Sequence, residues 1–370
     1  MTSGVAGSSR HDIERNELQA GMARIALIPG DGIGREVVAE AERVLASAVA
    51  RFGLSIETVE QDLGADRYIR DGITITDEEF RDLSDNYDGI LLGALGDPRV
   101  PTNVHAKDIL LGLRFKLDLY VNYRPAVLLD PDLSPLRDAS SIDLHVFREN
   151  TEGLYTGMGG TFKEGTTDEV AIQESINTRK GVERIIRAAF EFAASRNRRL
   201  VTLVDKANAM PIAGGLWRRV FAAVSDEYPG LETNTMYVDA MAMDLVRRPQ
   251  AYDVVVTSNL FGDILSDLAA ELTGGLGLAP SANVHPGRHA LFEPVHGSAP
   301  DIAGQGIANP VGAIRCAGLL LEHMGEREAA DTIEASVLEA FGQGVRTPDL
   351  GGTMRTDEVG HWIAEHVTSG

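Results

Sequence analysis

The sequence is poor in cysteine, in long apolar runs and in positive charge. Its one cysteine, Cys316, cannot form an intramolecular disulfide, and a zinc site built on cysteines is excluded. No apolar run approaches the roughly 18 residues that span a membrane. The first residues, MTSGVAGSSRHDIERNELQAG, lack the apolar core of a secretory signal. These absences predict a soluble, cytoplasmic protein with no membrane partner.

Acidic residues outnumber basic ones. The chain has 34 Lys and Arg against 55 Asp and Glu, which gives a formal net charge of −21. So acidic a chain repels phosphate backbones, and we expect no nucleic-acid partner, although a local basic pocket for a small anion is compatible with this charge. With 370 residues, 44% of them apolar and 24% charged, the composition is that of a globular protein of two or three domains.

From Arg24 onward, short apolar runs alternate with amphipathic stretches. The predicted strands are 25–28, 55–60, 89–92, 142–147, 200–204, 236–238 and 254–257. The predicted helices are 34–44, 109–119, 182–193, 215–228, 311–323 and 327–342, the last two closing the chain. This alternation implies an α/β fold with a largely parallel sheet.

Two segments depart from the alternation. Residues 155–176 are rich in glycine and threonine, which indicates a β-hairpin arm rather than a βαβ unit. Residues 1–23, rich in serine and glycine and then charged, are predicted to be a disordered extension. An added tail from expression or from the choice of start site would explain them equally well.

A glycine-rich turn follows the first predicted strand. Gly30, Gly32 and Gly34 invite comparison with the dinucleotide fingerprint of the Rossmann fold. Its third glycine should stand three residues after the second, where this sequence has Arg35, so the fingerprint fails, and no P-loop motif is present. The turn either approaches a ligand or only connects a strand tightly to a helix.

Three arginines, Arg114, Arg124 and Arg148, follow or end apolar segments. The planar guanidinium suits carboxylates, so the three could form an anion pocket, although surface salt bridges would also explain them. Leu110 and Leu111 precede Arg114 by four and three residues, so on a helix they share its face. That pattern predicts a substrate with a carboxylate and a hydrocarbon group, unless the leucines only fill the core.

Asp263 and Asp267 stand four residues apart in NLFGDILSDLAAEL. On a helix two like charges at this spacing are unfavourable without a cation. Asp239 ends the predicted strand MYVD, and ligand sites of α/β folds gather at strand ends. Such oxygen ligands suit magnesium or manganese. The alternative is a solvated acidic helix face.

Lys206 and Tyr155 are candidate proton-transfer groups. Lys206 follows the strand LVTLVD, and beside a cation in a desolvated site such a lysine can serve in acid–base work. A surface ion pair with Asp205 is the alternative. The phenol of Tyr155, seven residues after Arg148, could donate a proton to a developing carbanion.

The most distinctive stretch is FEPVHGSAPDIAGQGIANP, residues 292–310. Its glycines and prolines predict an ordered loop whose backbone amides could hold the phosphates of a cofactor. His296 could contact an adenine or a phosphate. Asp301 would accept hydrogen bonds from a ribose diol and repel a 2′-phosphate, so NAD is expected rather than NADP.

Taken together, these motifs resemble the isocitrate/isopropylmalate dehydrogenase family of metal-dependent, decarboxylating 2-hydroxy-acid dehydrogenases, over roughly residues 24–365. The motifs that carry the resemblance are IPGDGIG (28–34), LLGLRFKLDLYVNYRP (110–125), FRENTEGLYTG (147–157), VDKANAM (204–210), YVDAMAM (237–243), SNLFGDILSDLAAELTGGLGLAPSAN (258–283) and EPVHGSAPDIAGQGIANP (293–310).

The resemblance implies an α/β fold of two domains that is not a Rossmann fold. The first domain would comprise residues 24–119 and 275–370 and carry the NAD loop, and the second would comprise residues 120–274. The arm at 155–176 would clasp the partner subunit of a homodimer.

The resemblance also implies a role for each candidate residue. Residues that bind substrate would be Arg114, Arg124, Arg148, Leu110, Leu111 and Asn208. Ligands of Mg²⁺ or Mn²⁺ would be Asp239, Asp263 and Asp267. Catalytic residues would be Lys206, Tyr155 and Asp239. Residues that bind NAD would be His296, Gly297, Ser298, Ala299, Pro300, Asp301 and Asn309. In the family, the lysine and one metal aspartate reach the site from the partner subunit.

The substrate is predicted from the leucine pair that precedes Arg114. Leu110 and Leu111 resemble the isopropylmalate branch, which implies NAD-dependent oxidative decarboxylation of (2R,3S)-3-isopropylmalate to 4-methyl-2-oxopentanoate, the leucine-biosynthesis type of reaction. Many isopropylmalate enzymes have a glutamate one turn earlier, where this chain has Ala106, Lys107 and Asp108. Residues 100–101 and YVNYRP also resemble the D-malate and tartrate branch, so D-malate, tartrate or another 3-substituted malate is the alternative. A non-catalytic regulatory subunit is disfavoured because every metal and proton-relay position is filled.

Overall fold

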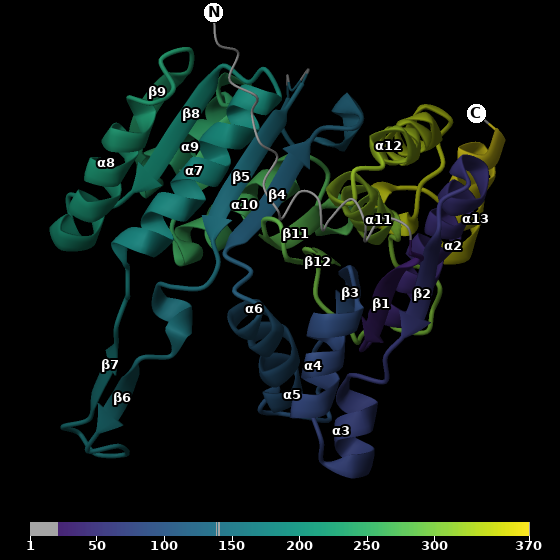
Figure 1. The fold of residues 1–370 in the computed structure, drawn as a ribbon, viewed down its shortest axis with the longest axis horizontal. Coiled ribbons are helices and arrows are strands. Elements are labelled where there is room, and N and C mark those ends of the chain that lie inside the picture. Colours follow the sequence, from purple (N-terminus) through teal and green to yellow (C-terminus); the bar gives the residue numbers. More distant parts are fainter. Residues whose placement is uncertain (1–20, 138, 140, 370) are drawn as a thin grey trace, which may run out of the picture.

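The structure, a computed structural model, describes residues 21–137, 139 and 141–369. Its centre is a ten-stranded sheet in the order β2-β1-β3-β12-β11-β4-β5-β10-β8-β9 (Figure 1). The strands are β1 (Ala23–Gly30), β2 (Ile56–Glu60), β3 (Gly89–Ala94), β4 (Val121–Val127), β5 (Asp143–Glu149), β8 (Leu200–Asp205), β9 (Glu232–Tyr237), β10 (Val254–Thr257), β11 (Pro280–His285) and β12 (His289–Pro294). The predicted α/β class is confirmed.

The sheet consists of two parallel blocks joined by an antiparallel centre. Strands β2, β1, β3 and β12 pair in parallel, as do β5, β10, β8 and β9. Between the blocks, β12, β11, β4 and β5 pair in antiparallel fashion. The hairpin of β11 and β12 was missed in the sequence, because β12 runs into the segment interpreted there as a loop.

Helices cover both faces of the sheet (Figure 1). They are α2 (Gly34–Phe52), α3 (Ala65–Asp71), α4 (Asp77–Asn86), α5 (Val104–Ala106), α6 (Gly112–Lys116), α7 (Arg179–Ser195), α8 (Pro211–Ser225), α9 (Val238–Arg247), α10 (Asn259–Leu272), α11 (Val311–His323), α12 (Arg327–Gly342) and α13 (Thr356–Ser369). The prediction that α11 and α12 close the chain is wrong. A third helix, α13, packs against α2 and buries Val359, Ile363 and Val367.

Four apolar clusters hold the helices to the sheet. One lies under α2, α11, α12 and α13, and a second packs around Ile109, Leu113 and the strands β1 and β3. The other two lie under α7 and α8 and under α9 and α10. Since β4 pairs directly with β11, the sheet runs without interruption past the predicted domain boundaries, and the division at residues 119/120 and 274/275 stays a prediction.

The predicted hairpin is confirmed. Strands β6 (Gly159–Phe162) and β7 (Val170–Gln173) pair in antiparallel fashion and project from the body of the molecule (Figure 1). Both strands are exposed along their whole length, and they carry apolar side chains such as Phe162 and Ile172. Apolar surface of this extent on an isolated hairpin is typical of an interaction site. Its function as an intersubunit clasp stays a prediction.

The predicted N-terminal extension, residues 1–23, lies outside the described residues except for its last three, and Ala23 already begins β1. Within the described parts of the chain, every helix is too short or too polar to cross a bilayer.

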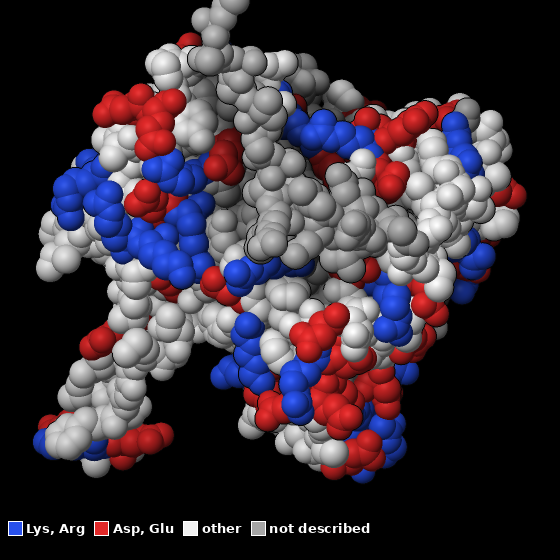
Figure 2. All heavy atoms as spheres, in the orientation of Figure 1, with Lys and Arg blue, Asp and Glu red and all other residues white. Residues whose placement is uncertain are grey.

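Charge is unevenly distributed over the surface. On the face drawn in Figure 2, acidic side chains gather over α3 and α4, and basic side chains gather over α7 and α8. Much of this basic group is paired. Arg187, for example, forms ion pairs with Glu183 and with Glu227. The pairing reduces the attraction of this patch for phosphate, and the absence of a nucleic-acid partner stays a prediction.

Candidate active site

The structure brings the three predicted arginines together on α6, β4 and β5. Each is at most 8% exposed, and each has a carboxylate partner. Nη2 of Arg114 lies 2.6 Å from Oε1 of Glu293, and Nη1 of Arg124 lies 3.1 Å from Oδ1 of Asp267. Arg148 pairs with Asp263. Burial, together with the neighbouring arginines, lowers the pKa of Arg148. The cluster therefore offers three closely spaced guanidinium groups, which in this structure are balanced by carboxylates of the same chain.

Asp263 and Asp267 lie on one side of α10, as their spacing predicts, and both carboxylates face this cluster. Nη1 of Arg124 lies within 3.5 Å of both. Burial alone would raise the pKa of Asp263, but Arg148 and Tyr155 outweigh it and the pKa is lowered. Burial dominates at Asp267 and raises its pKa. The side chains of the two aspartates are 33% and 50% exposed, so both remain accessible to a cation.

Tyr155 lies on the short turn Leu154–Thr156, beside the aspartates. Its hydroxyl donates a hydrogen bond of 2.7 Å to Oδ2 of Asp263, and its ring centre is 5.2 Å from the guanidinium carbon of Arg148. Burial and the adjacent Asp263 carboxylate both raise the pKa of Tyr155. The phenol therefore keeps its proton at neutral pH and can donate it.

Asn259 and Gly262 fix the side chain of Arg148. Oδ1 of Asn259 accepts hydrogen bonds from Nε and Nη2 of Arg148, at 3.0 and 2.7 Å. A Cβ added at Gly262 would lie 2.6 Å from Cβ and Cγ of Arg148, so glycine allows α10 to approach β5 this closely. Neither role was predicted from the sequence, although both residues stand in the NLFGD motif.

A buried polar network, also missed, fixes Arg114. Its partner Glu293 accepts a second hydrogen bond of 2.9 Å from Nδ2 of Asn283. Oδ1 of Asn283 in turn accepts hydrogen bonds from Asn122 and Asn150. All five side chains are buried. Apart from Arg114 on α6, they come from β4, β11, β12 and the residue that follows β5, so the network crosses the antiparallel centre of the sheet. Polar residues inside otherwise apolar strands were the available signal.

The segment that carries Leu110 and Leu111 is not the single helix predicted for 109–119. A turn of π-helix, Lys107–Leu111, separates α5 from α6, and α6 ends at Lys116. The backbone N–H of Gly112 reaches the carbonyl of Lys107, so the leucines do not have the ideal helical spacing from Arg114. Leu110 packs against an apolar core cluster, whereas Leu111 is half-buried outside that cluster. Such π-turns are frequent at functional sites.

Lys206 and Asp239 form a pair of their own. Nζ of Lys206 lies 2.5 Å from Oδ1 of Asp239, and this hydrogen bond lowers the pKa of Asp239. The prediction that Asp239 ends a strand is wrong. Strand β9 stops at Tyr237, and Asp239 lies in the first turn of α9. The alternative pairing of Lys206 with Asp205 is also wrong, since Asp205 is held by Arg218. Asn208 is exposed on the turn before α8.

Within the described residues of one chain, no three His, Cys, Asp or Glu side chains form a group that could hold a metal ion. Asp263 and Asp267 are together, whereas Asp239 is not with them. In the described residues of one chain, the three predicted metal ligands therefore do not form a single site.

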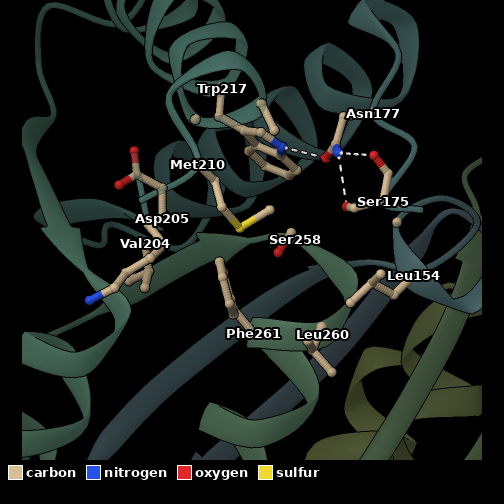
Figure 3. A pocket seen from close by; sticks show the side chains of 14 residues that line it. Leu154, Ser175, Asn177, Val204, Asp205, Met210, Trp217, Ser258, Leu260 and Phe261 are labelled. Atoms are coloured by element: carbon tan, nitrogen blue, oxygen red, sulfur yellow. Dashed lines mark hydrogen bonds between the residues drawn. The ribbon is translucent and has the colours of Figure 1, made fainter. Parts of the chain in front are cut away.

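An apolar pocket lies between Lys206 and the base of the arm (Figure 3). Trp217, Leu154 and Phe261 line it, and Nε1 of Trp217 donates a hydrogen bond of 2.9 Å to Oδ1 of Asn177. The pocket connects the Lys206 pair with the elements that carry Tyr155 and the two aspartates.

The predicted cofactor loop follows β12. Nε2 of His296 is enclosed yet has no protein partner within the described residues, and burial lowers the pKa of this histidine, so the ring is neutral. Pro300 borders a cavity of about 420 Å³, which Asp31 and Gly32 of the glycine turn also line. The turn therefore faces a potential ligand space. Asp301 is exposed, whereas Asn309 is buried and bonded to Asp349.

This geometry agrees with a family comparison. The family model described as isocitrate/isopropylmalate dehydrogenase matches residues 24–363. The chain belongs to this family. Members are decarboxylating dehydrogenases, so the chain is an enzyme, and the family in general implies a dinucleotide cofactor and a divalent metal ion.

Individual relatives support the same family assignment. A 3-isopropylmalate dehydrogenase of Corynebacterium kroppenstedtii is 49% identical over 94% of this chain and 100% of its own length. A 3-isopropylmalate dehydrogenase of Thermobifida fusca is 46% identical over 95% of this chain and 99% of its own length. The crystal structure of isocitrate dehydrogenase from Methylococcus capsulatus matches with a TM-score of 0.85 at 40% identity, covering 94% of this chain and all of that one. The crystal structure of the TT0538 protein from Thermus thermophilus matches with a TM-score of 0.83 at 36% identity. The match covers 94% of this chain and 68% of that one.

The close approach at Gly262 gives the first prediction. In Gly262→Ala the new methyl group must displace Arg148 or α10, and kcat/KM of the dehydrogenase reaction should fall about 100-fold, as for other small misplacements of positioning groups. Gly342→Ala is the matched control, because a Cβ there meets nothing within 4 Å. A folded Gly262→Ala enzyme with unchanged kcat/KM would show that Arg148 is not needed in this place.

Proposed function

We propose that the protein is a 3-isopropylmalate dehydrogenase that converts (2R,3S)-3-isopropylmalate to 4-methyl-2-oxopentanoate and CO₂ while it reduces NAD. The observation that carries this proposal is the near 50% identity to 3-isopropylmalate dehydrogenases over more than nine-tenths of the chain. The site supports it with three arginines for the two carboxylates and with Leu111 half-buried near Arg114.

The side chains of this chain have separable tasks in that reaction. Arg114, Arg124 and Arg148 bind and orient the two carboxylates of the substrate. Tyr155, whose raised pKa keeps it protonated, delivers a proton to carbon after CO₂ has left. In its neutral form, Lys206 accepts the proton of the 2-hydroxyl during hydride transfer. A divalent cation held by Asp263 and Asp267 would supply polarisation of the 2-hydroxyl and the 2-oxo group, and a bound nicotinamide would supply the hydride acceptor.

Asp263 and Asp267 fit a divalent cation. They offer partly accessible oxygens from one face of α10, and these are the donors that Mg²⁺ and Mn²⁺ prefer. The third ligand, Asp239, and the proton acceptor, Lys206, would come from the partner subunit of a homodimer. Exposed apolar side chains on the arm and on α8–α10 supply surface for such an interface. Examples are Phe162, Ile212 and Ile264.

A D-malate or tartrate dehydrogenase is the second candidate. It is favoured by the packing of Leu110 against the core, which leaves less apolar surface for an isopropyl group than the sequence suggests. Ala106, Lys107 and Asp108 occupy the region where many isopropylmalate enzymes have a glutamate, and this departure weakens the case for 3-isopropylmalate.

A panel of substrates decides between these candidates. Burying the three carbons of an isopropyl group at ~0.8 kcal/mol each should favour 3-isopropylmalate over D-malate by roughly 2 kcal/mol, or about 30-fold in kcat/KM. Isocitrate should be poor, because its third carboxylate would be desolvated beside leucine. Leu111→Ala should reduce the ratio, and Leu338→Ala, on the exposed face of α12, should not. Equal or faster turnover of D-malate would replace the proposal with the second candidate.

Activity should require a divalent cation. EDTA should abolish it, and added Mg²⁺ or Mn²⁺ should restore it. Asp267→Asn removes one charged ligand and should raise the cation concentration needed for half-maximal rate. Glu271→Gln, one turn further along α10 and exposed, is the control. Full activity in EDTA would exclude the proposed cation.

Cofactor preference should follow Asp301. Its carboxylate is exposed on the loop and would repel a 2′-phosphate, so kcat/KM should be higher with NAD than with NADP. Asp301→Asn should narrow the difference, whereas Asp331→Asn on α12 should leave it unchanged. A wild-type preference for NADP would contradict the assignment of this loop.

A further inference from the structure

The proposed cofactor loop is held by an acidic side chain from a distant part of the sequence. The carboxylate of Glu36, in the first turn of α2, accepts hydrogen bonds from the backbone N–H of Gly304 at 2.5 Å and of Gly306 at 2.9 Å. One oxygen serves each amide. Hydrogen bonds to a charged acceptor are stronger than neutral ones, and a carboxylate in this place is also favoured by the helix dipole.

The two glycines are shaped for this contact. Gly304 and Gly306 have φ of +77° and +65°, the left-handed region that glycine adopts without strain. These conformations turn the N–H groups of Gly304 and Gly306 toward one carboxylate, while the N–H of Gln305 between them donates to the carbonyl of Ile302 at 3.2 Å. The sequence suggested that such amides would hold cofactor phosphates. In the structure, the anion at these two amides is Glu36 of the same chain.

Two further contacts tie the same loop to neighbouring elements. The N–H of Ile33 donates to the carbonyl of Ser298 at 2.9 Å, and a Cβ at Gly32 would lie 2.0 Å from that oxygen. On the other side, the N–H of Thr356 donates to the carbonyl of Gly306 at 3.0 Å. In the sequence, Asp301 lies between the Ser298 contact and the Gly304 contact, so these two contacts restrict the position of Asp301 from both sides.

We propose that Glu36 is a positioning residue for the cofactor loop: it fixes residues 298–306 in the shape that presents Asp301 and the adjacent wall of the cavity to the dinucleotide. The role in cofactor binding rests on the proposed function. Glu36 itself binds the loop and not the cofactor.

The test uses Glu36→Gln in the full-length protein. Glutamine keeps the size but offers one acceptor for two amides, so one N–H faces an NH₂ group. Losing one charge-assisted hydrogen bond should raise Kd and KM for NAD about tenfold. The KM for 3-isopropylmalate and kcat at saturating NAD should change less than twofold. Glu42→Gln is the matched control on the same helix, because the Glu42 carboxylate is bonded by Thr58 and lies away from the loop.

Hydrogen exchange gives a readout that needs neither cofactor nor turnover. In the unliganded Glu36→Gln protein, peptides that cover residues 298–306 should exchange faster than in the wild type, while peptides from α12 should not. Gly304→Ala should reproduce the effect, since alanine is strained at φ +77° while Glu36 stays intact.

The two assays separate the proposals. Unchanged exchange and unchanged Kd in Glu36→Gln would overturn the role of Glu36, as would an equal rise in KM for NAD and for 3-isopropylmalate. If exchange of residues 298–306 rises in Glu36→Gln but the wild type binds no NAD, Glu36 does fix the loop. The assignment of the loop to the cofactor is then wrong.

Discussion

The structure around the site depends on the balance of buried charge. Three arginines lie almost out of water, and an unpaired charge in such a place would be very costly. Each is therefore paired with a carboxylate, and the partners come from different elements: Glu293 from β12 and two aspartates from α10. The positions of α6, β4, β5 and α10 are thus linked through ion pairs as well as through apolar packing.

The same balance suits the proposed reaction. A substrate with two carboxylates brings negative charge to the arginines, and a divalent cation brings positive charge to Asp263 and Asp267. Exchange of these internal pairs for ligand pairs leaves the total charge of the site nearly unchanged, so the pocket need not bury an uncompensated ion. Tyr155 lies at the junction of the two sets, in contact with Asp263 and against Arg148.

Around the proposed cofactor loop, backbone groups are held by side chains from the glycine turn and α2. Asp31 accepts hydrogen bonds from the N–H groups of Ala65 and Gly96, and it also contacts His105. Glu36, one turn further along, holds the loop. The turn that fails the Rossmann fingerprint thus lines the cavity with Asp31 and Gly32, and Glu36 at the start of α2 holds the loop beside it.

The sequence alone determined the family, the α/β class, the helices 311–323 and 327–342, the hairpin arm, and the shared face of Asp263 and Asp267. These follow from local periodicity and motif spacing, which short segments carry by themselves. Only the tertiary structure decided the antiparallel centre, the π-turn beside the leucines, the helical place of Asp239, and the partners Asn259, Asn283, Glu293 and Glu36. The contacts of these partners join strands and helices that are distant in the sequence, up to about 270 positions for Glu36, and local periodicity contains no information on which distant groups will share one buried charge or one amide.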